Sequence, residues 1–269
     1  MSDADIELIR SLMAAHPKGS KIIVFRKKSK DHIVELKHRG SEVFSSGTSL
    51  TEAFVKLPAE FILDSDSSIS VALHGETGEI KWKMKSGKEW NISGSLLPEP
   101  IELSGSWSVA FEPDRGAPAQ IMMEKLASWS KHTDRGVRYF SGVGTYKKFF
   151  TLQNAFLKKN TRISLDLGDV KELAEVLVNG KSAGILWRSL FVIDITTLVQ
   201  AGKNDLTIKV VNTWVNRLIS DKNVLKDEWI CKIVSPNPKW FTAQSPLHPS
   251  GLQGPVYIRA SQEYIVPQK

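Results

Sequence analysis

The chain has 269 residues, of which 41% are hydrophobic and 24% are charged. This balance allows one large or two ordinary packed domains and excludes disorder of the whole chain. The formal net charge is +7, but the basic residues are spread along the chain. That spread favours a solvated surface over a nucleic-acid-binding stripe, so no nucleic-acid partner is predicted.

Two further absences limit the cellular context. The single cysteine, Cys231, cannot form a disulfide within the chain, so it does not indicate a redox compartment. No apolar run is long enough to span a membrane, and no membrane partner is predicted. The sequence starts with acidic residues where a signal peptide would be basic, so the chain as given is not expected to export itself. The localisation stays open.

The first part of the chain is predicted to be a short helix followed by a small β-domain. Residues 1–17 form the helical segment, with the helix itself over 3–15 and a proline at its end. Residues 18–97 then alternate between apolar and polar positions in short runs, separated by Gly, Ser, Pro and Asp. The stretch has the length of one small immunoglobulin-like β-sandwich. Two prolines in GSLLPEP predict a linker after it.

The second predicted domain, residues 101–269, is also all-β, with long interruptions at 112–142 and 213–252. Within it, Asn179-Gly180 predicts a tight hairpin turn, because both residues readily adopt a positive φ. The return strand is expected to end at Leu186. Trp107, at the entry of a strand, is predicted to lie in the core. The layout favours a jelly-roll sandwich whose loops gather at its ends.

Five motifs mark this domain. They are SGSWSVAF (104–111), GVRYFSGVGTYKKFFTL (136–152), LDLGDVKELAEVLVNGKSAGILWR (165–188), NTWVNRLISD (212–221) and PLHPSGLQGPVYI (246–258). In order and spacing they resemble the galactose-binding-like jelly roll in the C-terminal region of the alpha-L-rhamnosidases of glycoside hydrolase family 106. The resemblance extends more loosely back to about residue 18, but it does not include the N-terminal helix.

The resemblance implies an accessory region rather than a complete enzyme. In that family the catalytic acid and base lie on a large barrel domain, and nothing in this sequence corresponds to it. From the residues alone, Asp221, Asp227 and Glu228 are loop carboxylates, and an inverting glycosidase needs two carboxylates facing each other. Their nearness in sequence does not create that geometry, and loop capping is the alternative. No catalytic residue, cofactor or metal site is predicted, and a bound Ca²⁺ stays open.

Sugars bind through ring stacking on aromatic side chains and through hydrogen bonds from Asn, Asp and Arg. The candidate carbohydrate-binding residues combine these types in the loops after predicted strands: Trp187, Arg188, Trp214, Asn216, Arg217, Asp221, Trp229, Trp240 and His248. For each there is a structural alternative, such as a packed tryptophan, a side chain that satisfies loop carbonyls, or a rigid turn at His248. Trp187 and Arg188 are either a recognition element or a packing surface between domains.

The leading hypothesis is therefore a non-catalytic accessory region of an alpha-L-rhamnosidase-like glycoside hydrolase. It would support the catalytic barrel, as a domain or a separate chain, and could contact a plant-type or pectic oligosaccharide. Two alternatives stay open, a free-standing carbohydrate-binding module and a structural protein-interaction module. The enzymes that the chain resembles are typically exported by bacteria.

Overall fold

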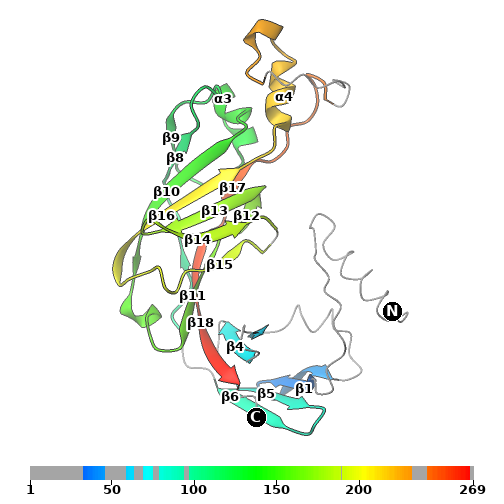
Figure 1. The fold of residues 1–269 in the computed structure, drawn as a ribbon, viewed down its shortest axis with the longest axis vertical. Helices are drawn as coiled ribbons and strands as arrows, with labels where there is room; N and C mark the ends of the chain where they lie inside the picture. The colour runs from blue at the N-terminus through cyan, green and yellow to red at the C-terminus, as the bar shows by residue number, and fades with distance from the viewer. Residues whose placement is uncertain are drawn as a thin grey trace, which may run out of the picture. The chain divides into compact units, whose positions relative to one another are not determined.

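The computed structural model describes residues 33–45, 59–63, 69–74, 79–93, 97–188, 190–231 and 241–266. Most of the regular structure in these residues is β-strand (Figure 1), which confirms the predicted all-β fold class. The predicted helix over 3–15 and the candidate site residue Trp240 lie outside the described residues. Within the described ranges, no helix is both long and apolar enough to cross a membrane.

The described residues form two compact units. The second unit consists of Pro100–Leu157 and Ile163–Arg259. The first unit takes the described residues up to Glu99, together with Lys158–Arg162 and the residues from Ala260 onward. The division at Glu99 falls inside the stretch with two prolines that predicts a linker. The last strand contributes residues to both units, with the division at Ala260.

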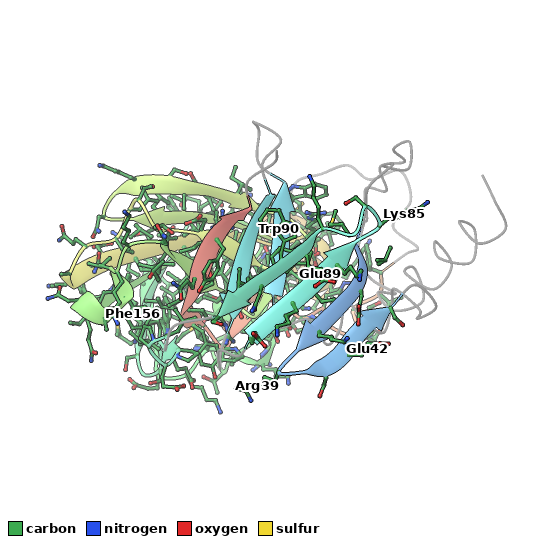
Figure 2. All side chains as sticks on the ribbon, turned by 90° about the horizontal axis from the view of Figure 1, so that it is seen from below. Arg39, Glu42, Lys85, Glu89, Trp90 and Phe156 are labelled. Atoms are coloured by element: carbon green, nitrogen blue, oxygen red, sulfur yellow. The ribbon has the colours of Figure 1, made fainter. Side chains whose placement is uncertain are left out.

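The first unit contains two antiparallel sheets. One has the order β2-β1-β5-β6, formed by β1 (Ile33–His38), β2 (Ser41–Ser45), β5 (Glu79–Met84) and β6 (Glu89–Ser93). In the other, β3 (Ala59–Leu63) pairs with β4 (Ile69–His74), which pairs with the C-terminal half of β18 (Tyr257–Val266). Trp82 is buried and stacks on Trp90, with 6.3 Å between ring centroids. Exposure alternates along β6, where Glu89 is exposed and the next residue, Trp90, is half-buried (Figure 2).

The second unit is a β-sandwich whose larger sheet has the order β14-β13-β16-β10-β8-β9. On the other sheet, β15 pairs with β11, which neighbours β18, and β7 pairs with Tyr257 and Ile258 at the start of β18. A two-stranded sheet of β12 and β17 completes the unit. Its elements in chain order are β7 (Ile101–Glu102), β8 (Trp107–Phe111), β9 (Gln120–Met123), η1 (Trp129–Lys131), α3 (Arg135–Arg138), β10 (Val143–Leu152), η2 (Asn154–Phe156), β11 (Thr161–Asp166), β12 (Asp169–Lys171), β13 (Leu173–Val178), β14 (Lys181–Leu186), β15 (Val192–Asp194), β16 (Gly202–Val211), α4 (Val215–Asp221), η3 (Lys226–Glu228) and β17 (Gly251–Gly254).

The core of the sandwich follows from the alternation along its strands. On β16, Leu206, Ile208 and Val210 are fully buried, while the residues between them are half-buried. Such a period of two places one face of each strand against the opposite sheet. Trp107 is fully buried on β8, which confirms its predicted core position. Trp129 is also fully buried, and its ring lies parallel to that of Tyr146 at 6.1 Å.

The predicted hairpin is confirmed. Asn179 and Gly180 have φ values of 52° and 76°, and Val178 pairs with Lys181 across the turn. The return strand ends at Leu186, as expected from the sequence. The Asn179 side chain donates to the carbonyl of Leu198 at 2.9 Å, so the turn is also tied to the segment before β16.

The phenol of Tyr146 joins β10 to β17. The Leu252 backbone N–H donates to the Tyr146 hydroxyl at 3.0 Å, and burial raises the pKa of that phenol above its ordinary value. Tyr146→Phe should lower the free energy of unfolding by about 1–3 kcal/mol, because a buried N–H loses its acceptor. Urea denaturation measures the loss. In the control, Tyr257→Phe removes an exposed 3.3 Å hydrogen bond to Glu102, and equal losses in the two variants would contradict the prediction.

Candidate functional site

The register of the larger sheet brings several strand ends to one end of the sandwich. Ala174, near the start of β13, pairs with Leu186 on one side and with Val210 on the other. The ends of β14 and β16 therefore flank the start of β13 at the same end of the sheet. The first residue of β10, Val143, pairs with the last residue of β16. Helix α3 precedes β10 and helix α4 follows β16, so both lie at this end (Figure 1). We call it the loop end.

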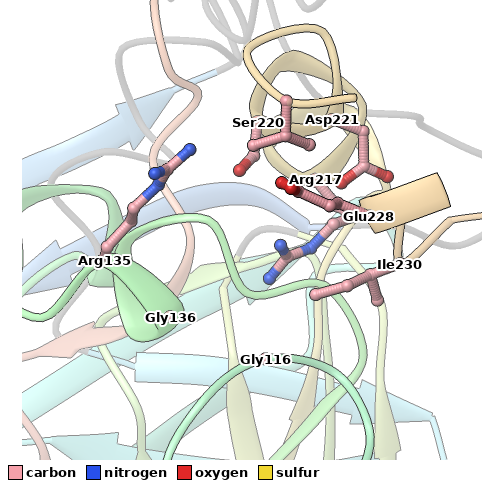
Figure 3. A pocket seen from close by; sticks show the side chains of 9 residues that line it. Gly116, Arg135, Gly136, Arg217, Ser220, Asp221, Glu228 and Ile230 are labelled. Carbon is pink, nitrogen blue, oxygen red and sulfur yellow. The ribbon is translucent and has the colours of Figure 1, made fainter. Parts of the chain in front are cut away.

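A cavity of about 300 Å³ lies at the loop end, among α3, α4 and the segment after β8 (Figure 3). Two arginines, two carboxylates, a serine and two aliphatic side chains line it, together with two glycines. The lining residues are Gly116, Arg135, Gly136, Arg217, Ser220, Asp221, Val224, Glu228 and Ile230. We call this cavity the loop-end pocket. It combines hydrogen-bond donors and acceptors with a small apolar wall.

Two glycines allow the walls of the pocket to approach each other. A Cβ on Gly136 would lie 2.0 Å from the carbonyl oxygen of Gly116, which is part of the backbone and cannot rotate away. A Cβ on Gly116 would lie 2.6 Å from Ile230 Cδ1, and Gly116 also has a positive φ of 82°. The segment after β8 therefore packs directly against α3. Asp134 caps this helix by accepting a hydrogen bond from the Val137 N–H at 3.0 Å.

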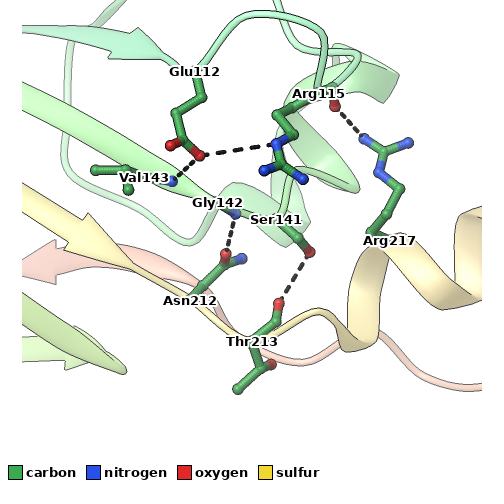
Figure 4. A network of polar contacts seen from close by, with 8 residues as sticks. All are labelled: Glu112, Arg115, Ser141, Gly142, Val143, Asn212, Thr213 and Arg217. Carbon is green, nitrogen blue, oxygen red and sulfur yellow. Dashed lines mark hydrogen bonds and ion pairs between the residues drawn. The ribbon is translucent and has the colours of Figure 1, made fainter. Parts of the chain in front are cut away.

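Arg217 is the buried cation of the pocket. Its side chain is only 5% exposed, and Nη2 donates to the carbonyl of Arg115 at 2.8 Å (Figure 4). Its buried Nε has no hydrogen-bond partner among the described residues. Burial lowers the pKa of the Arg217 guanidinium, and the nearby Asp221 carboxylate opposes that shift. Arginine keeps its charge in proteins, so the pocket holds a fixed, weakly hydrated cation.

Asp221 and Glu228 supply the carboxylates of the pocket. Asp221 is buried at the end of α4, where its Oδ2 accepts a hydrogen bond from the Cys231 N–H at 2.9 Å. Glu228 is exposed on η3. Asp227, the third carboxylate considered from the sequence, is exposed and does not line the pocket. Asp221 thus fixes the chain after η3 and faces Arg217 on the same helix.

A network of polar contacts fixes the strand ends below the pocket (Figure 4). The side chain of Asn212 accepts a hydrogen bond from the Gly142 N–H at 3.0 Å. Ser141 Oγ donates to the carbonyl of Thr213 at 3.0 Å. These bonds hold the start of β10 against the end of β16, so α3 and α4 are both anchored to rigid strands.

Trp214 and Trp229, which the sequence predicts as stacking residues, each lie beside a cation. Both indoles are half-buried. The guanidinium of Arg115 lies 4.7 Å from the ring centroid of Trp214. The ammonium of Lys222 lies 5.6 Å from that of Trp229. A cation therefore covers one face of each ring, as in a cation–π contact.

Asn216 and His248, two other candidates, bind each other through the His248 backbone. Asn216 is buried, and its side chain donates to the His248 carbonyl and accepts from the His248 N–H, both at 2.8 Å. The His248 side chain is exposed. In this arrangement Asn216 braces a loop, which is the structural alternative considered from the sequence.

Trp187 and Arg188 lie apart from the pocket residues, on an exposed apolar surface. Trp187 is 54% exposed and Leu190 is 82% exposed, and Ile185 and Val192 are exposed as well. We call Ile185, Trp187, Leu190 and Val192 the apolar edge. They lie on or between β14 and β15, which are the edge strands of the two sheets.

The sequence indicated only part of the site. It named Arg217 and Asp221, which meet in the pocket, and it considered Glu228. It missed Arg135, Gly116, Gly136 and Ile230, which reach the pocket from segments distant in sequence. It named Trp187 but not the aliphatic residues beside it, although GILWRSLFVID is visibly apolar. Among the described residues, no group of three or more His, Cys, Asp or Glu side chains could hold a metal ion.

Comparison with known proteins places the chain beside carbohydrate-active enzymes. No family model matches it. A putative beta-glucuronidase from Formosa agariphila is 35% identical over 206 residues, which cover 69% of this chain and 18% of that protein. A rhamnosidase from Novosphingobium sp. PP1Y has a similar structure, with a TM-score of 0.56 and 27% identity over 82% of this chain and 27% of the other. A beta-glucuronidase from Ruminococcus gnavus is less similar in structure, with a TM-score of 0.45 and 23% identity. The match covers 61% of this chain and 29% of the other.

The coverage is unequal in each of these comparisons. Most of this chain matches, yet it spans only 18% of the Formosa protein and 27% of the Novosphingobium rhamnosidase. The chain is therefore related to one region of larger glycoside hydrolases.

Proposed function

We propose that the chain is a non-catalytic accessory region of an alpha-L-rhamnosidase-like glycoside hydrolase of family 106. In this proposal the first unit is an immunoglobulin-like sandwich and the second a galactose-binding-like jelly roll. The observation that carries the proposal is the match of 82% of this chain to only 27% of the Novosphingobium rhamnosidase. The five sequence motifs that resemble family 106 support the same assignment.

The apolar edge supports a docking role toward the catalytic part of such an enzyme. Of the eight exposed large hydrophobic side chains in the described residues, four lie within residues 185–192. An exposed apolar cluster of this kind marks an interaction surface. Aliphatic side chains offer no hydrogen bonds to sugar hydroxyls, so Ile185, Leu190 and Val192 suit a polypeptide better than a glycan. The partner that we propose is the catalytic barrel, as a domain or a separate chain.

The test uses the Novosphingobium rhamnosidase without the region that matches this chain. We expect the two proteins to associate in trans, as measured by sedimentation velocity. Leu190→Asp should weaken that association at least about tenfold, because it buries an unpaired charge in an apolar interface. The matched control is Leu225→Asp, since Leu225 is 69% exposed but lies outside the apolar edge.

Two results would contradict the proposal. Hydrolysis of an aryl alpha-L-rhamnoside by the pure chain, abolished by Glu228→Gln, would make the chain an enzyme in its own right. Equal association of the Leu190→Asp and Leu225→Asp variants would remove the docking role of the apolar edge.

A second candidate function, a carbohydrate-binding module, is favoured by the polar lining of the loop-end pocket.

A further inference from the structure

We infer that the loop-end pocket binds one neutral sugar unit, held at its edge by hydrogen bonds rather than by ring stacking. The inference rests on the proposed function, because it takes the ligand from the glycans on which glycoside hydrolases act. It assigns the pocket to a different role from the apolar edge.

The size of the pocket favours a single sugar ring. Its volume of about 300 Å³ stands at the lower end of the range for ligand pockets in proteins. On one side the backbones of Gly116 and Gly136 pack directly together, so no side chain on Gly136 would fit between them. A branched or extended glycan would therefore place one residue in the pocket and the rest in solvent.

The charges of the pocket favour a neutral ligand. Its lining carries two guanidiniums, from Arg135 and Arg217, and two carboxylates, from Asp221 and Glu228, so its formal charge sums to zero. An anion would meet both carboxylates, and a cation would meet both arginines. A polyol suits the lining, because each hydroxyl can donate to a carboxylate oxygen and accept from a guanidinium N–H. Such charge-assisted hydrogen bonds are stronger than those between neutral groups.

Two of the four charged groups, Arg217 and Asp221, are held in place before any ligand arrives. Arg217 is fixed by the Arg115 carbonyl at 2.8 Å, and Asp221 by the Cys231 N–H at 2.9 Å. Both lie on α4 and are at least nine-tenths buried. A ligand then orders few side chains on binding, which lowers the entropic cost of association.

The remaining wall explains why ring stacking is not expected. Among the described residues, those that line the pocket include no aromatic side chain. Val224 and Ile230 instead provide a short aliphatic surface, which suits the C–H edge of a sugar ring. Trp214 and Trp229, on either side of the α4 and η3 lining residues in sequence, each carry a cation on one face.

The test compares methyl glycosides of neutral sugars with glucuronic and galacturonic acid, by saturation-transfer NMR and calorimetry on the full chain. We expect at least one neutral methyl glycoside to bind, with an affinity that high salt leaves unchanged. Glu228→Gln should weaken that binding about tenfold, because a hydrogen bond to a charged group is lost. Its matched control, Asp227→Asn, changes a neighbouring exposed carboxylate outside the pocket and should leave the affinity unchanged.

Asp221→Asn should also weaken binding, but it can disturb the fold, because Asp221 holds the Cys231 N–H. Glu228→Gln avoids this difficulty, since Glu228 is exposed. Binding of the uronic acids alone, lost at high salt, would overturn the inference, as would the absence of binding by every neutral sugar to folded protein. The association test with Leu190→Asp measures the apolar edge and not the pocket, so the failure of one proposal is distinguishable from the failure of the other.

Discussion

Replacing Trp129 with alanine is expected to lower the free energy of unfolding by about 3–5 kcal/mol, the usual cost of removing a large core side chain. Trp129 is fully buried in an aromatic cluster. Its ring centroid lies 5.4 Å from that of Phe140, 5.6 Å from that of Phe111 and 6.1 Å from that of Tyr146. The cavity left behind cannot close easily, because three rigid rings and two strands surround it.

The cost is raised further by the segments that Trp129 joins. Its ring lies against β17, because a Cβ on Gly251 would come within 2.6 Å of the indole. A Cβ on Gly144 would lie 2.4 Å from the Trp129 ring, so β10 also packs directly against the indole. Trp129→Ala therefore removes one side chain that contacts two separate parts of the sandwich.

Chemical denaturation followed by circular dichroism measures the loss. The matched control is Trp187→Ala, which removes the same side chain from a position that is 54% exposed. We expect less than about 1 kcal/mol there, because little buried area is lost. Similar losses in the two variants would show that the aromatic cluster is not the centre of the core.

The β-strands of the second unit were largely predictable, because their signal is local. An apolar residue at every second position, as in β13 and β16, specifies a strand with one buried face. Asn179-Gly180 specifies the turn between β13 and β14 by backbone conformation alone. Neither feature needs information from distant parts of the chain.

The loop-end pocket could be predicted only in part, because it depends on contacts between distant segments. The hydrogen bond from Arg217 to the carbonyl of Arg115 joins residues 102 positions apart. Arg135 and Gly136 come from α3, a four-residue helix inside a stretch expected to be a loop. No short pattern in the sequence indicates that these segments pack together. The residue types predicted hydrogen bonding to sugars, but not which side chains share a cavity.

Asn216 shows that neighbouring residues of one candidate group can make different contacts. From the sequence, Trp214, Asn216 and Arg217 formed one candidate group after a strand. On α4, successive side chains point about 100° apart. Arg217 lines the pocket, whereas Asn216 holds the backbone of His248. Nearness along a helix therefore did not imply shared contacts.

Asn216→Ala is expected to lower the free energy of unfolding by about 2–3 kcal/mol. It removes both partners of the His248 backbone at once, and polar groups left unpaired in a partly buried position are costly. The matched control is Asn223→Ala, where an exposed asparagine makes longer bonds to the carbonyls of Ile219 and Ala243, at 3.1 and 3.3 Å. Urea denaturation should give a loss below about 1 kcal/mol for that variant.

The sugar affinity of Asn216→Ala then separates bracing from ligand contact. Below its unfolding transition, the variant should bind the neutral methyl glycoside within about twofold of the parent chain, because Arg217 and Asp221 keep their own anchors. Loss of affinity with unchanged stability would instead make Asn216 a ligand-binding residue. In that case the sugar would lie against the His248 loop rather than in the loop-end pocket, and Glu228→Gln would leave its binding unchanged.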